Sequence, residues 1–112
     1  MRHKNILYQQ EQNIIINKLL DFLELDNENS IILYELDNNQ DKINNILSLL
    51  PEIKKFFSLS TIKGIREPND TKRPYLSTIK NVLKDDYYIY NTSIRINKIK
   101  TVKYIFIKKN LI

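Results

Sequence analysis

The sequence predicts a small α+β domain, and three observations support this class. The chain has 112 residues, which suits one compact domain. Apolar residues recur at helical spacing through the first part, whereas residues 87–107 alternate as paired strands do. With 42% hydrophobic and 28% charged residues, the composition is that of a folded chain. We therefore expect one domain over residues 1–112, with an N-terminal helix at 8–25 and a core over 30–108.

The first expected element is a helix from Tyr8 to Leu25. Ile15, Leu19 and Leu23 follow one another at intervals of four residues, which places them on one helical face. The polar run 26–29 is typical of a turn and should end this helix.

A short strand and two helices should follow. Residues 30–36 form a β-branched and aromatic run, which predicts one strand. Asp37 or Asn38 is expected to cap the next helix. Its buried stripe would consist of Ile43, Ile46, Leu47 and Leu50. Pro51 favours the start of a new helix that runs to Phe57. Proline suits the first turn of a helix, because the N–H that it lacks would have no partner there.

Residues 58–71 are expected to be irregular, and a further helix should run from Pro74 to about Lys84. Leu76, Ile79 and Leu83 would face the core. The opposite side carries hydrogen-bond donors and no acid: Arg73, Ser77, Lys80, Asn81 and Lys84.

Residues 87–107 should form a β-hairpin. Alternating positions on its two strands are Tyr88, Tyr90, Thr92, Ile94 and Ile96, then Val102, Tyr104 and Phe106. A three-residue loop over 97–99 would place both sets on one face, whereas a two-residue Asn97-Lys98 turn would not. Matching faces favour the longer loop. The other face near the tip would then carry Ser93, Arg95, Thr101 and Lys103.

This order of elements (helix, short strand, two helices, helix, hairpin) is that of a winged helix-turn-helix domain. In that fold the helix before the hairpin enters the DNA major groove, and the hairpin, or wing, contacts the backbone or minor groove. Charge placement agrees with this interpretation. Residues 1–53 carry a formal charge of −5 and residues 54–112 one of +10, and a basic half is typical of a polyanion binder. A solvated, lysine-rich surface is the simpler alternative.

The interpretation predicts duplex DNA binding, as a transcription regulator or a genome-associated protein. The candidate residues of the helix are Lys72, Arg73, Tyr75, Ser77, Thr78, Lys80, Asn81 and Lys84, and those of the wing are Arg95, Lys98, Lys100 and Lys103. The lysines at 72, 84, 98, 100 and 103 would neutralise phosphates. Arginine pairs with guanine and asparagine with adenine, so Arg73 and Asn81 are candidates for base readout together with Ser77 and Lys80. Tyr75 and Thr78 would contact phosphates or methyl groups.

Other functional classes are disfavoured. The chain has no cysteine, and its single histidine, His3, lies near the N-terminus, so thiol and histidine-based catalysis lack their residues. A single glycine cannot form a glycine-rich phosphate loop. No apolar run reaches the roughly 18 residues of a membrane span. We therefore expect no enzymatic activity, no cofactor, no metal site and no membrane partner, in an intracellular, reducing location.

Several segments also carry a resemblance to a known group. These are Phe56-Phe57-Ser58, Lys63-Gly64-Ile65, Pro68, Lys72-Arg73-Pro74-Tyr75-Leu76-Ser77-Thr78-Ile79-Lys80 and Thr101-Val102-Lys103-Tyr104-Ile105-Phe106. Together they resemble a small presumed DNA-binding domain that recurs in amoeba-infecting giant DNA viruses. The likeness spans about residues 30–108. It implies a viral protein in the cytoplasm of an infected cell or in the virion, and it supplies no catalytic motif.

Two other functions stay open at this stage. The acidic first half could meet the basic second half of another copy, giving a homodimer, a head-to-tail assembly or a protein-interaction module. Alternatively, Tyr87, Tyr88 and Tyr90 could stack on the bases of RNA or single-stranded DNA. Aromatic strand residues more often belong to a core.

Overall fold

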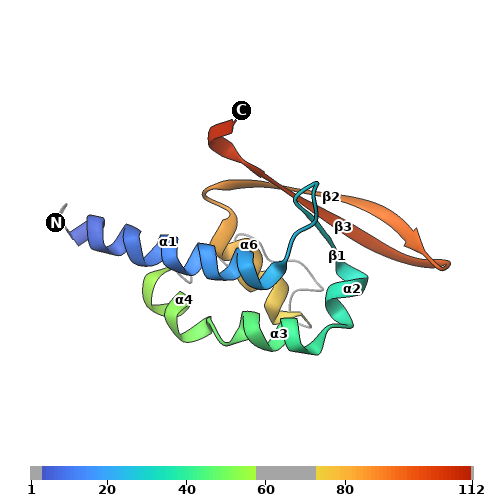
Figure 1. Ribbon diagram of the computed structural model, residues 1–112, viewed down its shortest axis with the longest axis horizontal. Coiled ribbons are helices and arrows are strands. Elements are labelled where there is room, and N and C mark those ends of the chain that lie inside the picture. Colours follow the sequence, from blue (N-terminus) through green and yellow to red (C-terminus); the bar gives the residue numbers. More distant parts are fainter. Residues whose placement is uncertain (1–3, 58–72, 112) are drawn as a thin grey trace.

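The computed structural model describes residues 4–57 and 73–111, which form a mixed α+β fold with a three-stranded antiparallel sheet (Figure 1). The elements in chain order are α1 (Lys4–Leu23), β1 (Ser30–Ile32), α2 (Leu33–Asp37), α3 (Gln40–Leu47), α4 (Leu50–Phe56), α6 (Pro74–Leu83), β2 (Tyr87–Ile96), β3 (Ile99–Lys108) and the 3₁₀ turn η1 (Lys109–Leu111). The α+β class is therefore confirmed. The irregular segment expected over 58–71 lies outside the described residues.

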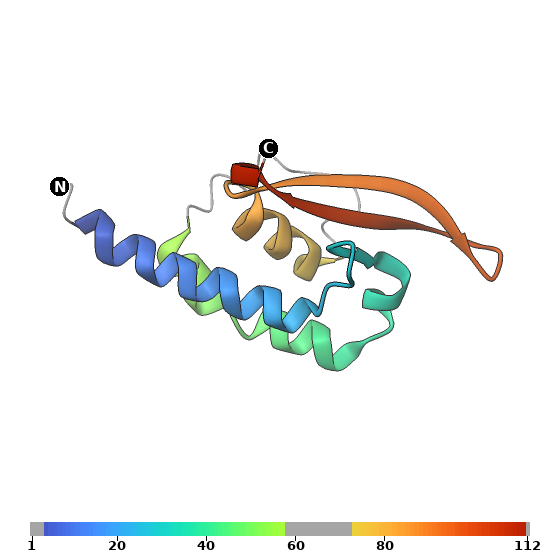
Figure 2. The same cartoon turned by 45° about the horizontal axis from the view of Figure 1, so that its top comes forward.

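The helices pack around one apolar core, and the stripes expected for α1 and α6 are confirmed. Ile15, Leu19 and Leu23 of α1 are buried, as are the three residues of α6 that were expected to face the core. In the stripe of the second expected helix, Ile43 and Ile46 are buried, but Leu47 and Leu50 are only half-buried and Leu50 belongs to α4. Helix α6 packs against α1 and α3. Figure 2 shows the long β2–β3 hairpin lying along one side of these helices, with its tip extending past α2.

The first helix begins earlier than expected, at Lys4 rather than Tyr8, and also ends earlier, at Leu23 rather than Leu25. Glu24 has a positive φ of 51°, which breaks the helical path before the polar run begins. The Lys42 ammonium then donates to the Leu23 carbonyl at 2.9 Å, a favourable placement of a cation at a helix C-terminus.

The expected strand over 30–36 is wrong beyond Ile32, because the chain turns into helix α2 at Leu33. A contact with the sheet stabilises this turn: the Tyr34 amide in the first turn of α2 donates to the Thr101 hydroxyl of β3 at 3.0 Å. The cap expected from Asp37 or Asn38 is also wrong. Asn39 is the N-cap of α3, and its side chain accepts from the Lys42 amide at 3.0 Å.

The sheet has the strand order β1-β3-β2, so β3 is central. Ser30 pairs with Ile105 and Ile32 with Lys103, which fixes the short β1 against the middle of β3. The β2–β3 ladder runs from the Tyr87–Lys108 pair to the Ile96–Ile99 pair.

The hairpin turn corrects the expected register. Ile96 pairs directly with Ile99, so the turn has two residues, Asn97 and Lys98, and not three. Both have positive φ, 50° and 70°, as the mirror-image turns of tight hairpins require. A one-residue difference exchanges the faces of a whole strand. Two sets that were expected on one face therefore lie on opposite faces: Val102, Tyr104 and Phe106 on one, and Tyr88, Tyr90, Thr92, Ile94 and Ile96 on the other.

Candidate nucleic-acid interface

Helix α6 does not present the polar outer side that the sequence predicts. Lys80 is 6% exposed and Asn81 only 2%, and Tyr75 and Thr78 are buried as well. Ser77 and Lys84 are half-buried. The expectation of a solvent-facing donor ladder is therefore wrong for Lys80 and Asn81, and its other members, Arg73, Ser77 and Lys84, are only half-exposed. The periodicity of α6 identifies its apolar face, but periodicity alone does not indicate that the polar sides of the helix are buried as well.

Arg73 and Tyr75, which were also assigned to the helix, contact an acid of the first half of the chain, Asp37. The Arg73 Nε donates to both carboxylate oxygens of Asp37, each at 3.1 Å, and the Tyr75 hydroxyl donates to the same carboxylate. Burial, and then the hydrogen bond to Asp37, raise the pKa of Tyr75 to about 12. This cluster joins the start of α6 to the end of α2. Lys72 lies outside the described residues.

A second cluster engages Lys103, which was assigned to the wing. Its ammonium donates to Glu28 at 2.7 Å, and this hydrogen bond raises the pKa of Lys103. Nearby, the Asp26 carboxylate accepts from the Ser30 hydroxyl at 2.7 Å and from the Ser30 amide at 3.0 Å, which lowers the pKa of Asp26. Lys103 thus links the hairpin to the loop before β1.

The residues expected together on one face near the tip are separated. Ser93 and Arg95 lie on one face of the hairpin and Thr101 and Lys103 on the other, because of the two-residue turn. Thr101 is also buried, as the acceptor for the Tyr34 amide.

The hairpin tip keeps an exposed cluster of three cations: Arg95, Lys98 and Lys100. Arg95 and Lys100 are direct cross-strand partners, and like charges in that position destabilise a hairpin. Residues 87–108 include no acid at all. Within the described parts of the chain, no carboxylate forms an ion pair with any of the three. The tip is therefore a projecting positive end, and a polyanion bound there would relieve the repulsion.

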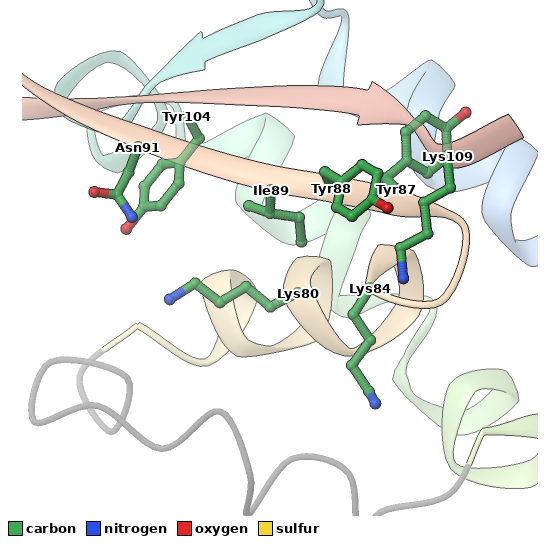
Figure 3. Close-up of a pocket in the computed structure, with 8 residues that line it drawn as sticks. All are labelled: Lys80, Lys84, Tyr87, Tyr88, Ile89, Asn91, Tyr104 and Lys109. Carbon is green, nitrogen blue, oxygen red and sulfur yellow. The ribbon is translucent and has the colours of Figure 1, made fainter. Parts of the chain in front are cut away.

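A second basic surface lies at the opposite end of the hairpin. There, a cavity of about 320 Å³ opens between the C-terminal part of α6 and the base of the strands (Figure 3). It is lined by Lys80, Lys84, Tyr87, Tyr88, Ile89, Asn91, Tyr104 and Lys109.

Two lysine–tyrosine pairs stand at the ends of this cavity. The Lys80 Nζ is 5.6 Å from the centre of the Tyr104 ring, and the Lys109 Nζ is 5.3 Å from that of Tyr88. Figure 3 shows the Lys80 ammonium directed toward the end with Tyr104 and Asn91, and Ile89 between the two pairs. The Lys84 ammonium points away from the rings and lies 3.7 Å from Asp85.

Comparison with known proteins adds no relative. No family model matches the chain, and neither does any curated protein or solved structure.

Within residues 4–57 and 73–111, no three His, Asp or Glu side chains gather as a group that could hold a metal ion. None of the described helices is long and apolar enough to span a bilayer.

Sequence reasoning missed the cavity, although parts of its signal were present. Three of the first four residues of β2 are tyrosines, and Lys108 and Lys109 lie at the end of β3 and the start of η1, so an antiparallel hairpin must bring the two groups together at its base. The contribution of Lys80 and Asn91 depends on how α6 packs beneath the strands, which no local pattern specifies.

Proposed function

We propose that this protein binds duplex nucleic acid through the β2–β3 hairpin, in a largely sequence-tolerant way. The observation that carries the proposal is the acid-free hairpin tip, where Arg95 and Lys100 are paired across the strands next to Lys98. Such a tip favours contact with phosphates, whose neutralisation releases counterions and gives affinity without base readout.

The proposal includes a winged-helix arrangement, with the hairpin as the wing. The order of the elements and the pairing of the short β1 with β3 support it. Helix α6 then acts mainly as a support for the hairpin. Readout of bases by Lys80 and Asn81 would require both side chains to leave buried positions, so we do not assign them that role. Arg73 and Tyr75 are likewise engaged by Asp37.

A salt titration of duplex binding tests the proposal. The logarithm of the binding constant should fall with the logarithm of salt concentration, by about 0.9 for each phosphate neutralised. The double variant Lys98→Gln/Lys100→Gln should weaken binding to all duplexes and reduce this slope by up to about 2. The matched control is Lys54→Gln/Lys55→Gln, which removes two exposed lysines from α4. Equal behaviour of the two double variants would refute the role of the tip.

The outer face of the hairpin favours self-association as a second candidate function. Tyr88 and Tyr90 are 42% and 50% exposed, and Ile99 and Ile107 on the same face are exposed too. In the described sheet β2 also forms an edge, and unpaired edge strands can pair with another chain. Sedimentation of the wild-type chain against Tyr90→Lys tests this candidate, which predicts a dimer that the variant dissociates.

A further inference from the structure

We propose that the cavity at the base of the hairpin binds a single nucleotide unit, an anionic phosphate joined to a planar base. The proposal goes beyond duplex binding, because the cavity and the cationic tip lie at opposite ends of the hairpin (Figures 1 and 3). Its volume of about 320 Å³ is at the low end of the range for small-ligand sites, roughly 300 to 1,000 Å³.

The ammonium groups of the cavity define the charge of the ligand. Lys80 and Lys109 reach it from two different elements, α6 and η1. None of the eight lining residues is acidic. Lys84 lies 3.7 Å from Asp85 and its ammonium points outward, so we do not assign it to the ligand. We therefore assign the phosphate to the exposed Lys109 ammonium beside Tyr88, since lysine is a common phosphate ligand, and Lys80 forms the buried end of the cavity.

The aromatic and amide groups define the remainder of the ligand. Tyr88 belongs to the outer face of β2, but its ring also lines the rim of the cavity at the end with Lys109. It is 42% exposed, so it can accept a stacked base, and Ile89 provides an apolar surface between the two lysine–tyrosine pairs. Stacking on tyrosine suits any base, because every base has a π-face. The Asn91 side-chain amide can donate one hydrogen bond to a base edge and accept another from it. Adenine is the base that matches this bidentate pattern. A simple anion would use the lysines alone.

Amide chemical-shift mapping on the intact chain tests the proposal, with adenosine 5′-monophosphate as the first probe. We expect shifts at Ile89, Asn91 and Lys109, and affinities at least tenfold weaker for adenosine alone and for inorganic phosphate alone. A single strand with a 5′-phosphate distinguishes the source of the nucleotide. Binding of the free monophosphate indicates a soluble ligand, and binding of the strand only indicates a nucleotide within nucleic acid.

Two surface variants and one control make the test specific. Tyr88→Leu removes the ring but keeps an apolar side chain, and Lys109→Gln removes the charge; each should weaken binding about tenfold or more. Lys55→Gln is the matched control, because Lys55 also lies over an aromatic ring, 5.6 Å from the centre of Phe56 on α4, and it should leave the affinity unchanged.

Several outcomes would overturn the proposal. These are phosphate binding as tightly as the nucleotide, full affinity in Tyr88→Leu, or no shift at the cavity with any probe. The failure of duplex binding would look different. A duplex that shifts the amides of Lys98 and Lys100, together with a nucleotide that shifts no cavity amide, supports the tip and overturns the cavity. A nucleotide that shifts Asn91 without any duplex binding does the reverse.

Discussion

The Asp37 cluster should contribute measurably to the stability of the fold. The Tyr75 hydroxyl donates to a carboxylate that also receives the Arg73 guanidinium, and the tyrosine side chain is buried. Tyr75→Phe removes only the hydroxyl and keeps the ring packing. Because a hydrogen bond to a charged group contributes about 1.5 to 3 kcal/mol, we expect the variant to lose that much unfolding free energy at pH 8.

The raised pKa of Tyr75 predicts how the stability of the folded state depends on pH. Burial and Asp37 raise it from 10.0 to about 12, so the folded state retains the phenolic proton longer than the unfolded state. Two pKa units correspond to about 2.7 kcal/mol. This stabilisation is complete below pH 10 and is lost as the pH rises from 10 toward 12. The difference between wild type and variant should therefore shrink across that interval.

Urea unfolding followed by circular dichroism, at pH 8, 10, 11 and 12, measures both effects. Tyr90→Phe is the control, because Tyr90 is half-exposed on the outer face of the hairpin and should show wild-type stability at pH 8. A Tyr75→Phe variant as stable as wild type at pH 8 would refute the reasoning. So would a difference that stays constant up to pH 12, since it would show that the ionisation of Tyr75 is not coupled to folding.

Three further predictions concern other parts of the fold. Leu19→Ala, at a fully buried position of α1, should cost about 3 to 5 kcal/mol of unfolding free energy, and Ile14→Ala on the exposed side should cost far less; chemical denaturation of both checks this. The lowered pKa of Asp26 predicts a contribution that is present above pH 3.8 and lost as the pH falls below it, so Asp26→Asn should remove this part of the acid dependence in a pH series of thermal melts. Lys98→Gly should stabilise the chain by about 1 kcal/mol, because glycine adopts positive φ freely, and the same substitution should weaken duplex binding because it removes a charge. A thermal melt measures the stability and a gel shift the affinity; a variant in which both rise or both fall would contradict this prediction.

Periodicity predicted the buried stripes well, because each is a local property of one helix. Ile15, Leu19 and Leu23 repeat at the helical period, and burial of one face follows directly from that spacing. The elements of the sheet were harder to predict. Leu33 to Asp37 has the composition of a strand continuation, but the Thr101 hydroxyl, 67 positions from Tyr34, accepts the amide of the new helical turn.

The hairpin register shows why alternation alone is insufficient. Both loop lengths fit the alternating pattern, and the choice depends on whether Asn97 and Lys98 can both adopt positive φ. Asparagine does so readily and lysine does not, so local preference gave no decisive signal at the second position. Packing of Tyr104 and Phe106 against the helices, which only the tertiary fold provides, agrees with the shorter turn.

The charge asymmetry of the chain has a different meaning once the contacts are known. Acids of the negative first half bind cations of the positive second half: Asp37 holds Arg73, and Glu28 holds Lys103. Part of the excess positive charge is thus neutralised within the molecule and stabilises its fold. The remaining exposed cations of the hairpin tip, Arg95, Lys98 and Lys100, belong to a segment without acids. Arg95 and Lys100 are direct cross-strand partners, and Lys98 lies in the turn beside them. A surface of that kind favours phosphate contact over base readout, so a binder of this design should discriminate weakly among duplexes of different sequence.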